Sequence, residues 1–180
     1  MNRKQFLKNC AGGLCSCTAI GLLIPTPSAA TESKPPEDWR WPFVKKRYAR
    51  LIKILAGKMD EAALNEILRE SGYSCAQESS SVRKHKGDLD GYIRELRERG
   101  GEDVTYDREK GIITVTGPER DDCFCPLITK KLTPQVACNC SLGWQECALE
   151  TVLGKKVKVA LKDSVLRGGK RCIFEIQVLA

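Results

Sequence analysis

The sequence predicts an α+β fold in which N-terminal helices precede a small antiparallel sheet packed with one helix. Three observations predict it. Apolar residues recur at helical spacing as far as residue 101. After Gly101 they alternate with polar residues, which is typical of half-buried strands. A single helical pattern, beginning at Ser141, interrupts the strand patterns. The length of 180 residues indicates one domain, which we expect over residues 41–180, with a helical part (41–101) and a cysteine-rich sheet part (102–180).

The first thirty residues are typical of an export signal. A basic start, "MNRKQFLK", precedes an apolar or small stretch over residues 10–24, and "PTPSAA" places small residues where a signal peptidase cleaves. We therefore expect residues 1–30 to be removed, residues 31–40 to be a linker, and the protein to be exported to the periplasm or the cell exterior. Contact with the membrane is expected only during export. The segment "NRKQFLK" resembles the twin-arginine export motif, with Arg3-Lys4 in place of two arginines.

The first helix is predicted in "WPFVKKRYARLIKILAGKM". Helical spacing places one apolar set on a single face: Val44, Tyr48, Leu51, Ile52 and Leu55. Most of the basic residues fall on the opposite face. A packed amphipathic helix with a solvated basic side is the favoured interpretation, and a basic helix lying on a membrane surface is the alternative.

Two more helices are expected before the sheet. Asp60 is a suitable N-cap for the second, which Gly72 would end. The polar stretch that follows is predicted to be a loop that carries a solvated His85. Asp88 would cap the third helix, and Gly100-Gly101 would end it.

Three strand-like patterns make up the sheet part. "DVTYDREKGIITVTG" predicts a hairpin, and "KKVKVALKD" and "RCIFEIQV" both alternate between apolar and polar residues. The residues expected to face inward are Val157, Val159, Leu161, Cys172, Phe174, Ile176 and Val178. The intervening helix would run from an N-cap at Ser141 to Gly154.

The net charge of +7 does not by itself indicate a nucleic-acid partner. Three of the positive charges, on Arg3, Lys4 and Lys8, lie in the predicted export signal. The rest of the chain mixes acids with bases and shows no basic stripe interleaved with aromatic residues. We therefore expect no nucleic-acid binding.

Four cysteines form two Cys-x-Cys pairs within eighteen residues: Cys123 with Cys125, and Cys138 with Cys140. In extended segments, residues i and i+2 point to the same side, so each pair would present two sulfurs on one face. Two facing pairs would suit a zinc ion or, less readily, an iron–sulfur cluster. Trp144, on the following helix, would close an apolar pocket beside them.

Two other uses of these thiols stay open. An oxidising compartment would favour disulfides, although removal of the export signal leaves seven cysteines of the ten, an odd number. Free thiols lining a small-molecule pocket are the third possibility. The expected function is therefore an exported protein that binds a small molecule or a metal ion. A cysteine-dependent redox or hydrolytic enzyme and a disulfide-stapled interaction domain are the alternatives.

The C-terminal third resembles the 4-vinyl reductase domain, a family of small modules that bind hydrocarbons and other small molecules. A cysteine cluster, a helix, "LGKKVKV" and the ending "SVLRGGKRCIFEI" carry the resemblance. The residues that match the family's ending are Gly168, Gly169, Cys172, Phe174 and Ile176.

The resemblance implies an α+β fold, a small apolar ligand and a zinc site built partly from cysteines, with Cys172 a candidate metal ligand. The alternation of the last strand instead makes Cys172 a core residue. The family usually carries an acidic residue and a cysteine on the preceding strand, where this chain has Leu161 and Ser164.

Overall fold

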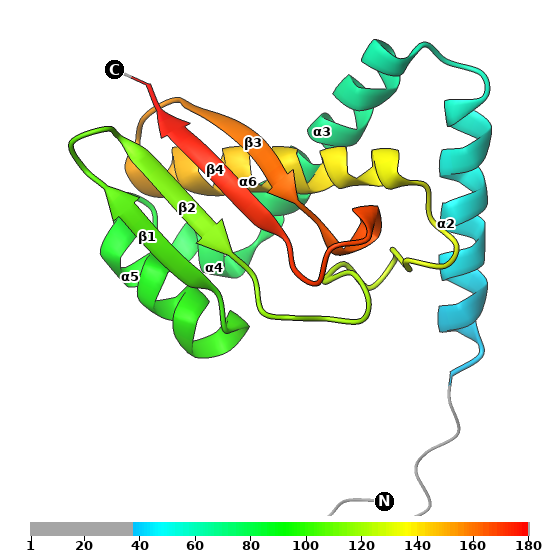
Figure 1. The fold of residues 1–180 in the computed structure, drawn as a ribbon, viewed down its shortest axis with the longest axis horizontal. Helices are drawn as coiled ribbons and strands as arrows, with labels where there is room; N and C mark the ends of the chain where they lie inside the picture. The colour runs from blue at the N-terminus through cyan, green and yellow to red at the C-terminus, as the bar shows by residue number, and fades with distance from the viewer. Residues whose placement is uncertain (1–37, 180) are drawn as a thin grey trace, which may run out of the picture. The chain divides into compact units, whose positions relative to one another are not determined.

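A four-stranded antiparallel sheet with helices on one face makes up residues 38–179, the part of the chain that the computed structural model describes (Figure 1). The predicted export signal lies outside the described residues. Within them, no helix has both the length and the apolar character that crossing a membrane requires. The α+β prediction is confirmed.

The strands are β1 (Asp103–Asp107), β2 (Ile112–Thr116), β3 (Val157–Asp163) and β4 (Ile173–Val178), in the order β1-β2-β4-β3. Every neighbouring pair is antiparallel, and β4 lies in the centre between β2 and β3. Apolar side chains alternate with polar ones along β3 and β4, as the sequence predicts, so that one face of the sheet is apolar.

The helices are α2 (Arg40–Ala56), α3 (Glu61–Glu78), α4 (Ser80–Lys84), α5 (Leu89–Glu95) and α6 (Cys138–Leu153). A π-helical turn, Leu96–Gly100, continues α5. Residues of α4, α5 and α6 pack on the apolar face of the sheet and form the main core. α3 packs extensively along α6.

The predicted helix boundaries at Asp60, Asp88 and Gly101 are confirmed. The Asp60 carboxylate accepts a hydrogen bond from the Ala63 amide at 2.8 Å, and Asp88 accepts one from the Gly91 amide at 2.9 Å. Both bonds satisfy amides that a helix start leaves without an intrahelical partner. Gly101 ends the third helical segment with a φ of 68°, a conformation that favours glycine.

The predicted helix end at Gly72 is wrong. α3 continues through Gly72 to Glu78, and Gly72 is buried. A Cβ at this position would overlap the backbone carbonyl of Cys140 in α6, and a Cβ at Gly143 would overlap the carbonyl of Arg69 in α3. The two glycines are therefore required by a close crossing of α3 and α6.

We expect Gly72→Ala to lower the free energy of unfolding by about 2 kcal/mol or more, because the added methyl meets rigid backbone and forces the helices apart. This cost exceeds the gain of about 1 kcal/mol in helix propensity. Gly57→Ala is the matched control, since the nearest atoms to a Cβ there lie at 3.6 Å. Urea unfolding of both variants measures the effect, and a Gly72→Ala protein as stable as Gly57→Ala would contradict the crossing.

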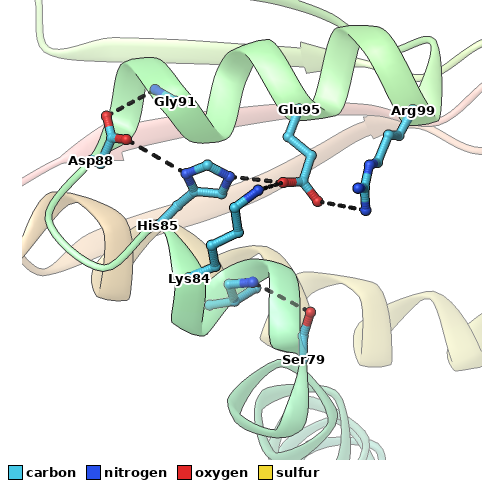
Figure 2. A network of polar contacts seen from close by, with 8 residues as sticks. Ser79, Lys84, His85, Asp88, Gly91, Glu95 and Arg99 are labelled. Atoms are coloured by element: carbon cyan, nitrogen blue, oxygen red, sulfur yellow. Dashed lines mark hydrogen bonds and ion pairs between the residues drawn. The ribbon is translucent and has the colours of Figure 1, made fainter.

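His85 lies in a polar network between α4 and α5, not in a solvated loop as predicted (Figure 2). Only 8% of the residue is exposed. Its Nε2 lies 2.8 Å from a carboxylate oxygen of Glu95, and its Nδ1 lies 3.5 Å from Asp88. The Glu95 carboxylate also pairs with Lys84 at 3.2 Å and with Arg99 at 3.3 Å. This network fixes α4 to α5 on the sheet.

Hydrogen bonds from His85, Lys84 and Ser81 lower the pKa of Glu95 to about 2. A lowered pKa in the folded state means that ionised Glu95 stabilises the fold above its ordinary pKa of 4.5, and that this contribution is lost as the pH falls from about 4.5 to about 2. We therefore expect Glu95→Gln to be less stable than the wild type at pH 6 and to lose less stability over that pH window. Chemical denaturation at a series of pH values measures the free energy of unfolding of each protein. Glu109→Gln, at an exposed carboxylate, is the control; parallel profiles for all three proteins would contradict the assignment.

α2 packs through part of the predicted face: Tyr48, Ile52 and Leu55 contact the rest of the chain as expected, whereas Val44 and Leu51 do not. Ala49 and Ile52 are buried and Tyr48 is half-buried, but Val44 and Leu51 are 41% and 51% exposed. The contact face is therefore shifted around the helix axis from the predicted face, and apolar side chains are left on the outside.

Candidate functional site

A small pocket lies where α6 begins, between the end of β3, the start of β4 and the segment 121–134. Its lining comprises the thiols of Cys123, Cys138 and Cys172, two serines and five apolar residues. The serines are Ser141 and Ser164, and the apolar residues are Ile128, Ala137, Leu161, Leu166 and Phe174. Its interior measures about 10 Å³, which is roughly the space that one water molecule requires.

The strands form the floor of this pocket. Leu161 of β3 is the register partner of Phe174 of β4, and both side chains face it. A register irregularity between Leu161 and Asp163 follows at once, and Ser164 then begins a 3₁₀ turn over Val165–Arg167. The chain leaves the sheet at this point and carries Leu166 over one side of the pocket.

Helix α6 begins at Cys138, three residues before the predicted N-cap at Ser141. The 3₁₀ turn Gln135–Ala137 leads directly into it after Pro134. The fixed φ of proline is compatible with this position at the start of a helical run. Cys138 and Cys140 therefore belong to a helix and not to an extended segment.

This helical start overturns the expectation that Cys138 and Cys140 share a face. In an α-helix, residues i and i+2 are separated by about 200° around the axis. Cys138 is buried in the pocket, whereas Cys140 does not line it. Cys140 instead lies near Cys125 and Cys75, and its pKa is raised mainly by burial and to a smaller extent by these thiols.

The Cys138 thiol is held by polar groups from the strand exit. Its Sγ lies 3.3 Å from the Ser164 hydroxyl, which accepts a hydrogen bond from the Arg167 amide at 3.1 Å. Burial raises the pKa of the Cys138 thiol, although the Ser164 and Arg167 side chains oppose the shift. Cys138 therefore carries a protonated thiol at neutral pH.

Two half-buried thiols, Cys123 and Cys140, are also poor acids. Burial raises the pKa of Cys123 to about 11, with a smaller contribution from the nearby Cys172. Burial likewise raises the pKa of Cys140 to about 11 and that of Tyr48 to about 12. At neutral pH these groups are uncharged, and the region around the pocket is largely apolar.

The thiols lie near one another without forming a metal centre. Within residues 38–179, no three or more His, Cys, Asp or Glu side chains are grouped so as to hold a metal ion. Structural zinc requires four converging ligands, and thiol ligands must be deprotonated. As placed, the residues proposed as metal ligands do not fit zinc or an iron–sulfur cluster. None of the seven described cysteines is in a disulfide.

Cys172 and Trp144 occupy different surroundings. Cys172 packs against the main core, as the alternation of the last strand predicts, and it also lines the pocket. Its role as a metal ligand stays a prediction. Trp144 packs against the main core and is not among the residues that line the pocket. Its role as a ligand contact stays a prediction.

Seven of the ten lining residues were not predicted as site residues: Ile128, Ala137, Ser141, Leu161, Ser164, Leu166 and Phe174. Ser164 is 1% exposed and Leu166 is 6% exposed. A serine directly after a strand and before "VLR" is a signal for a side-chain-capped turn, but it does not indicate which face the turn covers.

Comparison with protein-family models and with curated protein sequences finds no match. Among solved structures, the chain is similar to a trafficking protein particle complex subunit 3 from Naegleria fowleri, described as covalently bound to palmitic acid. The TM-score is 0.50 at 19% sequence identity, over 78% of this chain and 96% of that one. The two proteins share a fold. A vinyl-4-reductase family protein from Methanocaldococcus jannaschii gives a TM-score of 0.40 at 15% identity, over 83% of this chain and 85% of that one.

We expect the described thiols to differ strongly in their reactivity. Cys75 is exposed, whereas Cys138 and Cys147 are buried, so maleimide should modify Cys75 at least about tenfold faster in the native protein at pH 7.5. Peptide mapping by mass spectrometry over time measures each site. Denatured protein is the control, in which the rates should converge. Equal native rates for Cys75 and Cys138 would contradict the burial of the pocket thiol.

Proposed function

We propose that this chain binds a small apolar molecule in the pocket between α6, β3 and β4. The proposal rests on the composition of the pocket lining, in which five apolar side chains lie beside three thiols. A protonated thiol behaves as a small hydrophobic group. A concave, mostly apolar site with a few polar groups is typical of small-molecule binding.

The ligand would enter by displacing the segment 121–134. The hydrogen bonds that residues 121–133 make in the described part of the chain join residues of this same range. The Ile128 amide donates to Cys125 at 3.1 Å, and the Lys130 amide donates to Asp122 at 2.7 Å. Side chains such as Ile128, and not backbone ladder bonds, hold the segment against the pocket. Movement of the segment would enlarge the pocket without breaking the sheet.

Two resemblances support an acyl or hydrocarbon ligand. The Naegleria subunit, which shares the fold, is described as bound covalently to palmitic acid. The sequence ending around Cys172 and Phe174 resembles that of a hydrocarbon-binding family. We therefore favour a long acyl chain as the ligand class. Export to the periplasm or the cell exterior stays a prediction, because residues 1–30 lie outside the described part.

We expect Leu161→Trp to weaken binding of a fluorescent fatty acid by about tenfold or more, because the indole would occupy the pocket. Ala160→Trp is the matched control. It introduces the same side chain one residue away, on the exposed face of β3. Displacement by palmitate measures the affinity of each protein.

Wild-type protein that binds no fatty acid, or equal affinities for the two tryptophan variants, would contradict the proposal. Mass spectrometry before and after treatment with hydroxylamine distinguishes reversible binding from a thioester. Cys138→Ser then tests the buried thiol that lines the pocket.

A further inference from the structure

The outer face of α2 combines exposed apolar and basic side chains. Phe43 is 48% exposed, Leu51 is 51% exposed and Ile54 is 53% exposed. At the start of the helix, Trp39 and Trp41 are 71% and 50% exposed. The helix packs against the rest of the chain through its other side, where Ala49 and Ile52 are buried and Tyr48 and Leu55 are half-buried.

The charge of α2 is entirely positive. Its bases are Arg40, Lys45, Lys46, Arg47, Arg50 and Lys53, and no acidic residue occurs from Arg40 to Ala56. Arg40 pairs with Asp38 at 2.7 Å. Lys46, Arg50 and Lys53 make no ion pair within residues 38–179.

These unpaired bases form one stripe. Lys46, Arg50 and Lys53 are spaced by four and three residues, so they project from the same side of the helix. Together with Ala49 and Leu132 they line a shallow groove of about 250 Å³. Three cations thus surround a depression with an apolar lining, which is suited to an anionic group on an apolar body.

The apolar side chains form a second stripe beside the basic one. Phe43, Leu51 and Ile54 fall at helical spacing, with Arg47 between them. The Arg47 guanidinium lies over the Phe43 ring, 5.3 Å from its centroid. A long basic side chain held along an apolar stripe in this way can keep its charge at a polar boundary while its stem stays in apolar surroundings.

We propose that α2 docks on the surface of an anionic lipid bilayer, with its axis parallel to the membrane. Phe43, Leu51 and Ile54 would enter the boundary between headgroups and acyl chains, and lipid phosphates would occupy the groove lined by Lys46, Arg50 and Lys53. Basic residues beside an exposed apolar stripe, with tryptophans at one end, are typical of helices that lie in a membrane interface. An acidic protein would be complementary to the cations but would not account for the apolar stripe.

The test is co-sedimentation of the full chain with vesicles of phosphatidylcholine containing 30% phosphatidylglycerol (about that fraction suffices for a negative surface). We expect Lys46→Glu/Arg50→Glu/Lys53→Glu to lower the partition coefficient of the protein between vesicles and water by about 100-fold or more. The matched control, Lys155→Glu/Lys158→Glu/Lys170→Glu, lowers the net charge equally at exposed lysines elsewhere and should bind much more tightly than the α2 variant.

A second readout tests insertion. Lipids brominated on the acyl chain should quench the tryptophan fluorescence of the wild type. In Trp39→Phe/Trp41→Phe the remaining fluorescence, from Trp144, should not be quenched by these lipids. Equal binding by the two charge-reversal variants, or quenching that persists without Trp39 and Trp41, would overturn the proposal. Binding to soluble polyglutamate as tight as to vesicles would also overturn it and would assign an acidic protein partner.

Discussion

The close crossing of α3 and α6 determines where every other part of the site lies. Gly72 and Gly143 each lie against the backbone of the opposite helix, at positions that a Cβ would block. The crossing fixes the rotation of α6 about its axis. Cys140 then faces α3, and Cys138, about 200° away around the helix, faces the strand exit. The position of the pocket therefore depends on Gly72 and Gly143 as well as on the residues that line it.

Burial determines the chemistry that the pocket can perform. Removal of Cys123 and Cys138 from water raises the pKa of both thiols, so the uncharged form is favoured. A metal would have to displace those protons and draw the ligands together. An apolar ligand requires neither change, because neutral thiols and leucine side chains present similar surfaces to it. The same desolvation that disfavours a metal therefore favours an apolar occupant.

Local signals predicted much of the fold, and long-range packing explains where they failed. Helix ends were predicted where a residue caps the adjacent backbone, at Asp60, Asp88 and Gly101. The alternation in β3 and β4 likewise depends only on neighbouring residues. Gly72 resembled a helix end because its partner, Cys140, is far along the chain. His85 resembled a loop residue because Glu95, its partner, lies on another helix. The cysteine pairs were recognised, but whether Cys138 and Cys140 share a face depended on a helix start that no local signal placed.

Tyr48 links the two proposed surfaces. It lies on α2 and packs against a small cluster whose four residues all line the pocket: Ile128, Ala137, Cys138 and Leu166. It packs as well against the cluster containing Ile52, by which α2 is attached to α3. Lipid contact on the outer face of α2 would therefore act on the pocket through one side chain. A protein that takes an apolar molecule from a bilayer requires this proximity, because the ligand then crosses little water between the membrane and its site.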